Sequence, residues 1–319
     1  MITKQPKTLI EAIRFFSDPD TCLNYMVGVR WPNGIACPTC GSVEVSFLAT
    51  RRIWKCKAKH VKQQFSVKVG TIFEDSPIGL DKWLTTMWLI ANAKNGISSY
   101  EVHRAIGVTQ KTAWFMLHRI RLAMQPDDGD KMTGTVEADE TFIGGKRMFM
   151  HLDRRERVFK GMTTGSAGKT VVFGLLERHG PDGHSRVRTK VVKGTRHGDL
   201  IPEIRKNVEQ GSELFTDTHP TYHRVEGYAH DFINHAEEYV RGKVHTNGME
   251  NFWSLLKRAI KGTYVAVEPF HLFRYLDEQA LRFNTRKASD ADRFERVSSS
   301  VVGKRIMYKD LIGATTTPA

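Results

Sequence analysis

The stretches GTVEAD (residues 134–139) and ELFTD (residues 213–217) are short apolar segments that each end in an aspartate. Their composition favours β-structure, so each is predicted to be a strand with a carboxylate, Asp139 or Asp217, at its end. A third acid, Glu250, lies farther along the chain. Three carboxylates converging from such elements can hold two divalent cations, Mg²⁺ or Mn²⁺, that activate an attacking oxygen and stabilise a leaving one at phosphorus. The trio is a stronger signal than any member, since Asp217 alone could cap a turn.

The segment NGMENFWSLLKR (residues 247–258) contains Glu250 and has the apolar spacing of an amphipathic helix. Lys257 follows Glu250 by two helical turns, so both side chains are expected on one face, where Lys257 can hold a phosphate beside the metal ions. Trp253 is expected to face the core. Asn247 is a competing third ligand, because a neutral carbonyl oxygen also binds Mg²⁺.

The order of predicted elements around these acids indicates the fold class. Strands in a run, followed by alternating helix and strand, favour a mixed α/β sheet. The predicted strands are residues 134–142, 170–177, 186–193, 213–217 and, more weakly, 231–234, with helices over about 197–209 and from 247 onward.

The chain is strongly basic, with a formal net charge of +13 over 319 residues and a pI near 9.6. A polyanion is the simplest partner for such a surface, and double-stranded DNA is the first candidate. The alternative is a basic surface that serves only solubility. Neither a secretory signal nor a run of about 20 apolar residues is found, and the four cysteines are too few for a disulfide scaffold. A cytoplasmic, nucleoid-associated protein without membrane contact is therefore expected.

A metal-binding pattern precedes these elements. Cys37 and Cys40 form a C-x-x-C knuckle, and Cys56 with His60 forms a second pair after a short hairpin. Two such pairs predict a zinc ribbon, since thiolate and imidazole suit one tetrahedral, structural Zn²⁺. A redox C-x-x-C pair is the competing interpretation. Cys22 is an alternative fourth ligand if His60 does not bind.

Residues 78–125 are predicted to form three helices, of which the last two and their short turn have the pattern of a helix-turn-helix. Ser98 and Glu101 predict a capping box, and Thr109 predicts the N-cap of the third helix. A small helical bundle without DNA contact is the alternative. The residues expected to touch DNA are Gln110, Lys111 and Thr112 at the start of the third helix, and His118, Arg119 and Arg121 farther along it.

Composition characterises two further segments. Residues 146–169 are rich in Lys and Arg, including Arg154 and Arg155, and are interpreted as a loop that DNA orders. Residues 288–319 are predicted to be a polar, disordered C-terminal tail.

Several stretches together resemble a known family. On them the chain is similar to bacterial insertion-sequence transposases of the ISXO-like group, which place a DDE catalytic domain behind an N-terminal zinc ribbon. The resemblance runs from about residue 20 to 287. The stretches are RWPNG (30–34) leading into CPTCG (37–41), FSVKVGTIFEDS (65–76), VEADETFIGGK (136–146), HTNGMENFWSLLKR (245–258) and FNTR (283–286).

The resemblance implies an RNase H-like mixed sheet with flanking helices. It assigns Asp139, Asp217 and Glu250 as the triad for two Mg²⁺ or Mn²⁺ ions, with Lys257 as the trailing basic residue; Arg258 beside it is expected to contact DNA. Some members carry Asn as the third residue, and His60 departs from the family's four-cysteine pattern. The implied domains are an N-terminal helix and zinc ribbon (1–76), a helix-turn-helix-like segment (77–125), the DDE domain (133–287) and the tail (288–319).

The implied activity is DNA transposition. Such an enzyme binds the terminal inverted repeats of its element, cleaves the element ends and joins the 3′-hydroxyl ends to target DNA, and it works as a homodimer or higher oligomer because two ends must be joined. The alternatives are a nuclease of the same fold that only hydrolyses DNA, and a DNA-binding regulator with vestigial carboxylates.

Overall fold

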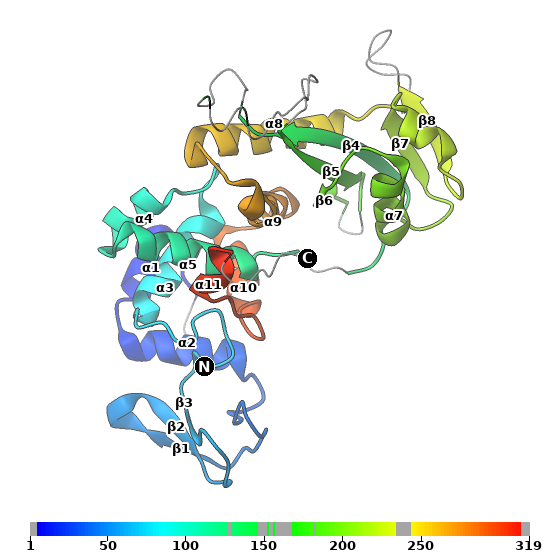
Figure 1. The fold of residues 1–319 in the computed structure, drawn as a ribbon. Helices are drawn as coiled ribbons and strands as arrows, with labels where there is room; N and C mark the ends of the chain where they lie inside the picture. The colour runs from blue at the N-terminus through cyan, green and yellow to red at the C-terminus, as the bar shows by residue number, and fades with distance from the viewer. Residues whose placement is uncertain are drawn as a thin grey trace. The chain divides into compact units, whose positions relative to one another are not determined.

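The structure, a computed structural model (Figure 1), divides into two compact units. A helical unit contains residues 1–125 and 287–319, and a sheet unit contains residues 126–286. The parts of the chain that the structure describes are residues 5–126, 129–145, 168–180, 183–233 and 244–313, together with Leu152 and Glu156.

Helices α1 (Leu9–Phe15) and α2 (Pro19–Arg30) open the helical unit, and α3 (Leu80–Asn92), α4 (Ser99–Ile106) and α5 (Gln110–Ala123) follow. The predicted caps are present. Ser98 and Glu101 form a capping box at α4, Gly107 ends α4 with φ +62°, and the Thr109 hydroxyl accepts from the Thr112 N–H at α5. Helix α3 forms the centre of this unit, with Trp83 and Trp88 both buried.

The C-terminal segment differs from the expected tail. Residues 290–299 form α10 (Asp290–Ser299) and residues 308–311 form α11 (Tyr308–Leu311), both in the helical unit. Phe294 of α10 is buried among aromatic rings, with centroids 5.4 Å from Phe16 and 5.2 Å from Trp88. A segment of polar composition can still pack in this way, because one apolar stripe is enough to dock a short helix.

A three-stranded antiparallel sheet lies between α2 and α3 in the chain. Its strands are β1 (Val45–Leu48), β2 (Ile53–Cys56) and β3 (Gln64–Phe65), with the 3₁₀ turn η1 (Ala49–Arg51) before β2. One face is aromatic. Trp54 of β2 contacts Phe47, Phe65 and also Trp31, at centroid distances of 5.1–6.1 Å.

The sheet unit contains a five-stranded sheet of order β6-β5-β4-β7-β8. The strands are β4 (Thr135–Ile143), β5 (Thr170–Glu177), β6 (Arg186–Val192), β7 (Glu213–Asp217) and β8 (Ala229–Ile233). β4, β5 and β6 pair antiparallel, whereas β7 and β8 run parallel to β4. This is the predicted RNase H-like mixed sheet, and the predicted strand positions agree with it within a few residues.

Helices cover both faces of this sheet, as Figure 1 shows. On β5, Val172 and Leu176 pack against α8 (Asn247–Ala259) and α9 (Leu272–Asn284), while Phe173 and Leu175 pack on the side of α7 (His197–Asn207). This alternation is why β5 is apolar almost throughout. The remaining turns are η3 (Pro220–Arg224), the π-helical η4 (Ile260–Tyr264) and η5 (Pro269–His271). In the described part of the chain no helix is both long and apolar enough to cross a bilayer.

Candidate active site and metal centre

Asp217 ends its strand as predicted, whereas Asp139 lies in the middle of the neighbouring strand β4, because β4 continues past it to Ile143. β4 and β7 are parallel, with Glu137 opposite Phe215, so Asp139 and Asp217 fall on the same face and close in level. That face is the one covered by α8. The indole N–H of Trp253, on α8, donates to Oδ2 of Asp139 at 2.9 Å, and Oδ1 accepts from the Glu140 backbone N–H at 2.8 Å.

Gly174 makes room for this contact. It pairs with Asp139 across β4 and β5. A Cβ at this position would lie 2.2 Å from Met249 Cε and 2.7 Å from two ring carbons of Trp253. The absence of a side chain therefore lets α8 approach the sheet closely enough for the indole to reach the carboxylate.

Burial and neighbouring negative charge raise the pKa of two carboxyls here, Asp139 and Glu140. Burial is the main reason that the pKa of Asp139 rises from 3.8 to about 7, and the charges of Glu140 and Asp217 add to it. Burial likewise raises the pKa of Glu140 to about 7, with Asp217 contributing, while a hydrogen bond from the Tyr222 hydroxyl (2.5 Å) opposes the rise. Buried like charges of this kind are what a divalent cation relieves, so the donor set fits Mg²⁺ or Mn²⁺.

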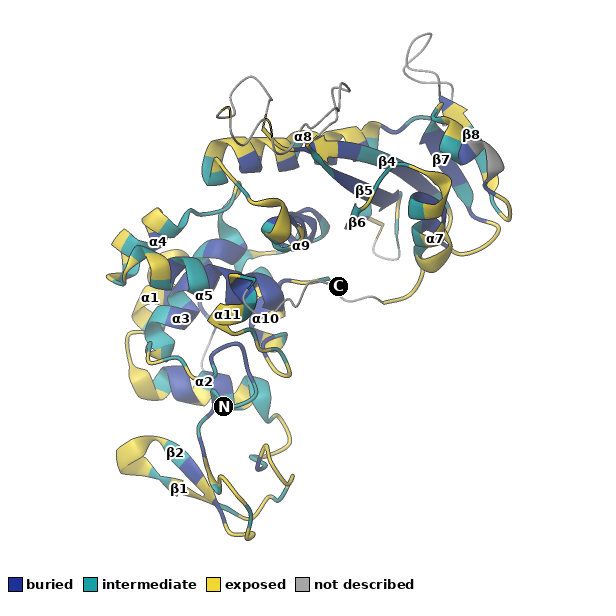
Figure 2. Ribbon diagram, in the orientation of Figure 1, coloured by how far each residue is buried: buried dark blue, intermediate teal, exposed yellow. Residues whose placement is uncertain are grey.

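The third acid is less closely placed. Helix α8 has both exposed and buried residues along its length (Figure 2); Glu250, its competitor Asn247, and Lys257 are all exposed, whereas Trp253 is buried as expected. Glu250 Oε1 lies 3.5 Å from the Thr246 hydroxyl. Asp139, Asp217 and Glu250 do not form a compact ligand cluster. Within the described residues, the cluster of potential metal ligands is the Cys/His group of the zinc ribbon.

A buried ion pair fixes the start of α8. Glu137 is 1% exposed and accepts from Arg178 Nε at 2.6 Å and from the Met249 backbone N–H at 2.8 Å. The same guanidinium donates to the His245 carbonyl at 2.6 Å. Glu137 thus connects β4 to the first turn of the helix that carries Glu250.

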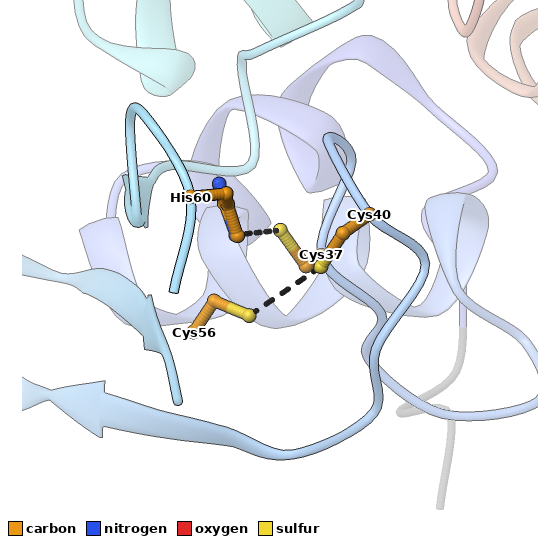
Figure 3. A group of neighbouring side chains, drawn as sticks. All are labelled: Cys37, Cys40, Cys56 and His60. Carbon is orange, nitrogen blue, oxygen red and sulfur yellow. Dashed lines mark hydrogen bonds between the residues drawn. The ribbon is translucent and has the colours of Figure 1, made fainter. Parts of the chain in front are cut away.

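The predicted zinc ligands come together. Cys37, Cys40, Cys56 and His60 offer donor atoms that all lie within 4.8 Å of one another (Figure 3). Cys22 is excluded as the fourth ligand, because it is buried on α2 with its thiol donating to the Phe16 carbonyl at 3.2 Å, and burial raises its pKa to about 12.

The cluster fits structural Zn²⁺. His60 Nε2 is 3.5 Å from Cys37 Sγ, while Nδ1 lies 2.7 Å from the Val61 carbonyl. That second contact turns Nε2 toward the thiols, as in metal-ligating histidines generally. Burial opposes ionisation of Cys37, yet the backbone N–H groups of Thr39 and Cys40 lower its pKa to about 7, which favours the thiolate that zinc needs.

Helix α5 does not present the DNA-contacting face expected of it. Arg119 is 4% exposed and its guanidinium donates to the carbonyls of Ile72 and Glu74 at 2.9 and 2.8 Å. Arg121 is 1% exposed, and His118 is fully buried against Trp114. These three residues are packing residues in this structure, so the prediction that they contact phosphates is corrected. The Arg119 guanidinium is enclosed because the 72–76 turn and the C-terminal segment, through the Ile306 carbonyl, both contact it.

The remaining residues expected to contact DNA differ in their exposure and in their contacts within the protein. Lys111 is exposed with its ammonium group 4.6 Å over the ring of Tyr308, and Gln110 donates to the Ser99 hydroxyl at 2.8 Å. Thr112 is half-buried, and Arg258 is exposed on α8. Arg154 and Arg155 lie outside the described residues.

Comparisons with known proteins agree with this geometry. An ISXO2-like transposase domain matches residues 131–284, and a transposase zinc-ribbon domain matches residues 17–58. A Haemophilus influenzae protein described as an uncharacterized transposase-like protein is 33% identical over 101 residues, which are 31% of this chain and 81% of that protein. The chain belongs to the ISXO2-like transposase family.

The similarity to a second protein extends over most of this transposase. It is described as an uncharacterized protein in transposable element ISH50 of Halobacterium salinarum. The two are 25% identical over 256 residues, which cover 77% of this chain and 84% of that protein. The similarity therefore spans both compact units.

Sequence reasoning missed the residues that arrange the site. Trp253 was expected only to face the core, and Gly174 drew no attention. Glu137 lies in the same predicted strand as Asp139 and has no role assigned from sequence, although it forms a buried ion pair. The Glu137-x-Asp139 spacing was the available signal, because two acids on one buried face need partners.

Proposed function

We propose that this transposase cleaves the ends of its DNA element and joins the freed 3′-hydroxyls to target DNA. The carrying observation is the half-buried Asp139 carboxylate on the central strand of an RNase H-like sheet, held by Trp253 beside Asp217. In the first displacement, water replaces the 3′ oxygen at phosphorus and the element's 3′-hydroxyl is released. In the second, that hydroxyl attacks a target phosphodiester and another 3′ oxygen leaves.

Asp139 and Asp217, with Glu250 or Asn247, would hold the cations. Two divalent ions supply activation of the attacking oxygen and stabilisation of the leaving one. Trp253 keeps one Asp139 oxygen oriented, and Lys257, exposed on α8, would hold a phosphate. Both displacements use the same site, because only the nucleophile changes between them.

Removing either aspartate tests this assignment. Asp139→Ala and Asp217→Ala should each abolish cleavage and strand transfer, while duplex binding stays nearly unchanged, because affinity comes from Lys and Arg residues elsewhere. Glu268→Ala is the matched control, an acid of the same unit outside the site. Wild-type turnover in Mg²⁺ by either aspartate variant would refute the assignment.

The third ligand is decided by a pair of substitutions. Glu250→Gln and Asn247→Ala remove one candidate each from the exposed face of α8. The variant with the larger loss of turnover identifies the ligand. The same assay is repeated at raised Mg²⁺. Full recovery of turnover by the less impaired variant is expected if its residue only neighbours the ions.

Two alternatives remain distinguishable. A nuclease of this fold would cut DNA but would not join a pre-cut element end to a second duplex, whereas a transposase does both. A regulator would bind DNA and cut nothing. We favour transposition, in the cytoplasm on nucleoid DNA and by a dimer or higher oligomer, because two element ends must be joined in one event.

A further inference from the structure

The burial of α5 leaves open which surface of the helical unit recognises DNA. Lys111, in the first turn, is the one exposed residue of that helix, since its second half is buried throughout. Recognition in the major groove needs a helix face or a β-ribbon face with several side chains free to reach base edges. The small sheet of the zinc ribbon has such a face.

The two faces of this sheet are chemically opposite. Pairing places Phe47, Trp54 and Phe65 in one cross-strand row and Ser46, Lys55 and Gln64 in the next. Because neighbouring residues point to opposite faces, the aromatic row lies on the side of Trp31 and the polar row lies on the other. All three polar residues are exposed.

The polar row is suited to base edges. Lys can donate to guanine, Gln can pair with adenine, and Ser can serve either. Strands lie about 4.8 Å apart, so the row runs across the ribbon at regular intervals. Arg51, from the η1 turn, donates to Gln64 Oε1 at 2.9 Å and so orients the amide before any DNA binds.

The charge around the row is that of a duplex-binding surface. Residues 44–64 contain six Lys and Arg residues and one acid, Glu44. Lys57, Lys59 and Lys62 are all exposed next to the zinc ligands. This surplus complements phosphates on both sides of a groove, whereas an acid-rich protein partner would not need the uncharged Ser and Gln between the cations.

We propose that the Ser46–Lys55–Gln64 face of the zinc ribbon is the base-reading surface of this transposase and lies in the major groove of the element ends. The proposal rests on the proposed function, because it assigns the recognition step of that reaction. Zinc contributes indirectly, by holding Cys56 of the central strand and so the register that aligns the row.

The test is DNA binding by full-length, zinc-loaded protein. Labelled duplexes tiled across both flanks of the gene are compared with a mixed-sequence duplex of equal length. Lys55→Ala/Gln64→Ala should lose the preference for flank DNA by roughly tenfold or more, since bidentate base contacts are worth at least that much discrimination. Lys94→Ala/Asn95→Ala removes a lysine and a side-chain amide from another exposed site and should change nothing.

A second variant separates phosphate from base contacts. Lys62→Ala should weaken binding to both probes alike and lower the salt slope by about one. Zinc content and melting temperature are measured for every variant, so that unfolding is not mistaken for lost recognition. Equal preference in Lys55→Ala/Gln64→Ala and the wild type, with cleavage intact, overturns this inference alone. A wild type that binds no duplex and cuts none overturns the proposed function as well.

Discussion

Two neutral donors, the Glu140 backbone N–H and the Trp253 indole N–H, bond to the Asp139 carboxylate. Burial favours its protonated form, and the Trp253 indole N–H, at 2.9 Å, opposes that effect because it bonds to the charged form. The contact also fixes the carboxylate's rotation, which leaves its orientation independent of any cation. Trp253 is therefore a positioning residue as well as part of the core.

Trp253→Phe should separate these two roles. Phenylalanine keeps much of the packing against Gly174 but has no N–H, so the pKa of Asp139 should rise further. The acid limb of the cleavage rate should then move to higher pH, with a fall in rate at neutral pH of roughly tenfold. Phe252→Leu, a core change on the same helix without a bond to Asp139, should lower stability without moving the limb. An unshifted limb in Trp253→Phe would contradict the positioning role.

The raised pKa values of Asp139 and Glu140 predict a pH-dependent response to metal. Between pH 4 and 7 the folded state holds protons that the unfolded state releases, so this contribution to the free energy of unfolding is present at low pH and is lost as pH rises through 7. Mg²⁺ or Mn²⁺ binds the charged form.

The measurement for this second prediction is the melting temperature of the sheet unit within the full-length chain. Added Mn²⁺ should raise it clearly at pH 8 and little at pH 5. Asp139→Asn should melt with a smaller pH dependence and should lose the Mn²⁺ effect. A metal response that is equal at both pH values would argue against these carboxylates as ligands.

At the scale of elements, the zinc ribbon depends on its metal. The strands β1 to β3 are short, and their aromatic face is small, so the ligand cluster supplies much of the folding free energy. Cys37→Ser should lose the zinc, expose Trp54, and shift tryptophan emission to the red, whereas metal analysis of the wild type should give one zinc per chain. Cys22→Ala should keep its zinc, since Cys22 lies outside the cluster. Full zinc occupancy in Cys37→Ser would refute the four-ligand set.

The elements also show what sequence patterns can and cannot predict. The strands β4 to β7, the capping box at Ser98 and the zinc ligands follow from local patterns, because each has its signal within a few residues. The contacts of Trp253 with Asp139 and of Glu137 with Arg178 join residues far apart in sequence, so no local pattern contains them. Helix α5 has the spacing of a helix-turn-helix, but whether such a helix is exposed depends on what packs over it.

At the scale of the whole molecule, the chain leaves the helical unit once and returns to it. The sheet unit is one continuous segment, residues 126–286, and the residues after it complete the helical unit. The returning segment is bonded to the rest of the helical unit: Arg293 donates to the Asn92 side chain at 3.0 Å, and the Gly303 N–H donates to the Gly70 carbonyl at 2.9 Å. Residues 287–313 are thus a part of that unit's core.

Truncation should therefore affect the two units unequally. A chain ending at Arg286 loses Phe294 and exposes Phe16 and Trp88, and loss of a buried aromatic side chain typically costs about 3–5 kcal/mol. The helical unit should melt at much lower temperature or fail to fold, and recognition of flank DNA should be lost with it. The sheet unit should keep its own transition and its Mn²⁺ response, since all its strands remain. A chain ending at Gly313 is the control and should behave as the wild type. If the chain ending at Arg286 keeps a wild-type melting profile, the last helices are dispensable and residues 287–313 are the simple tail that their composition suggests.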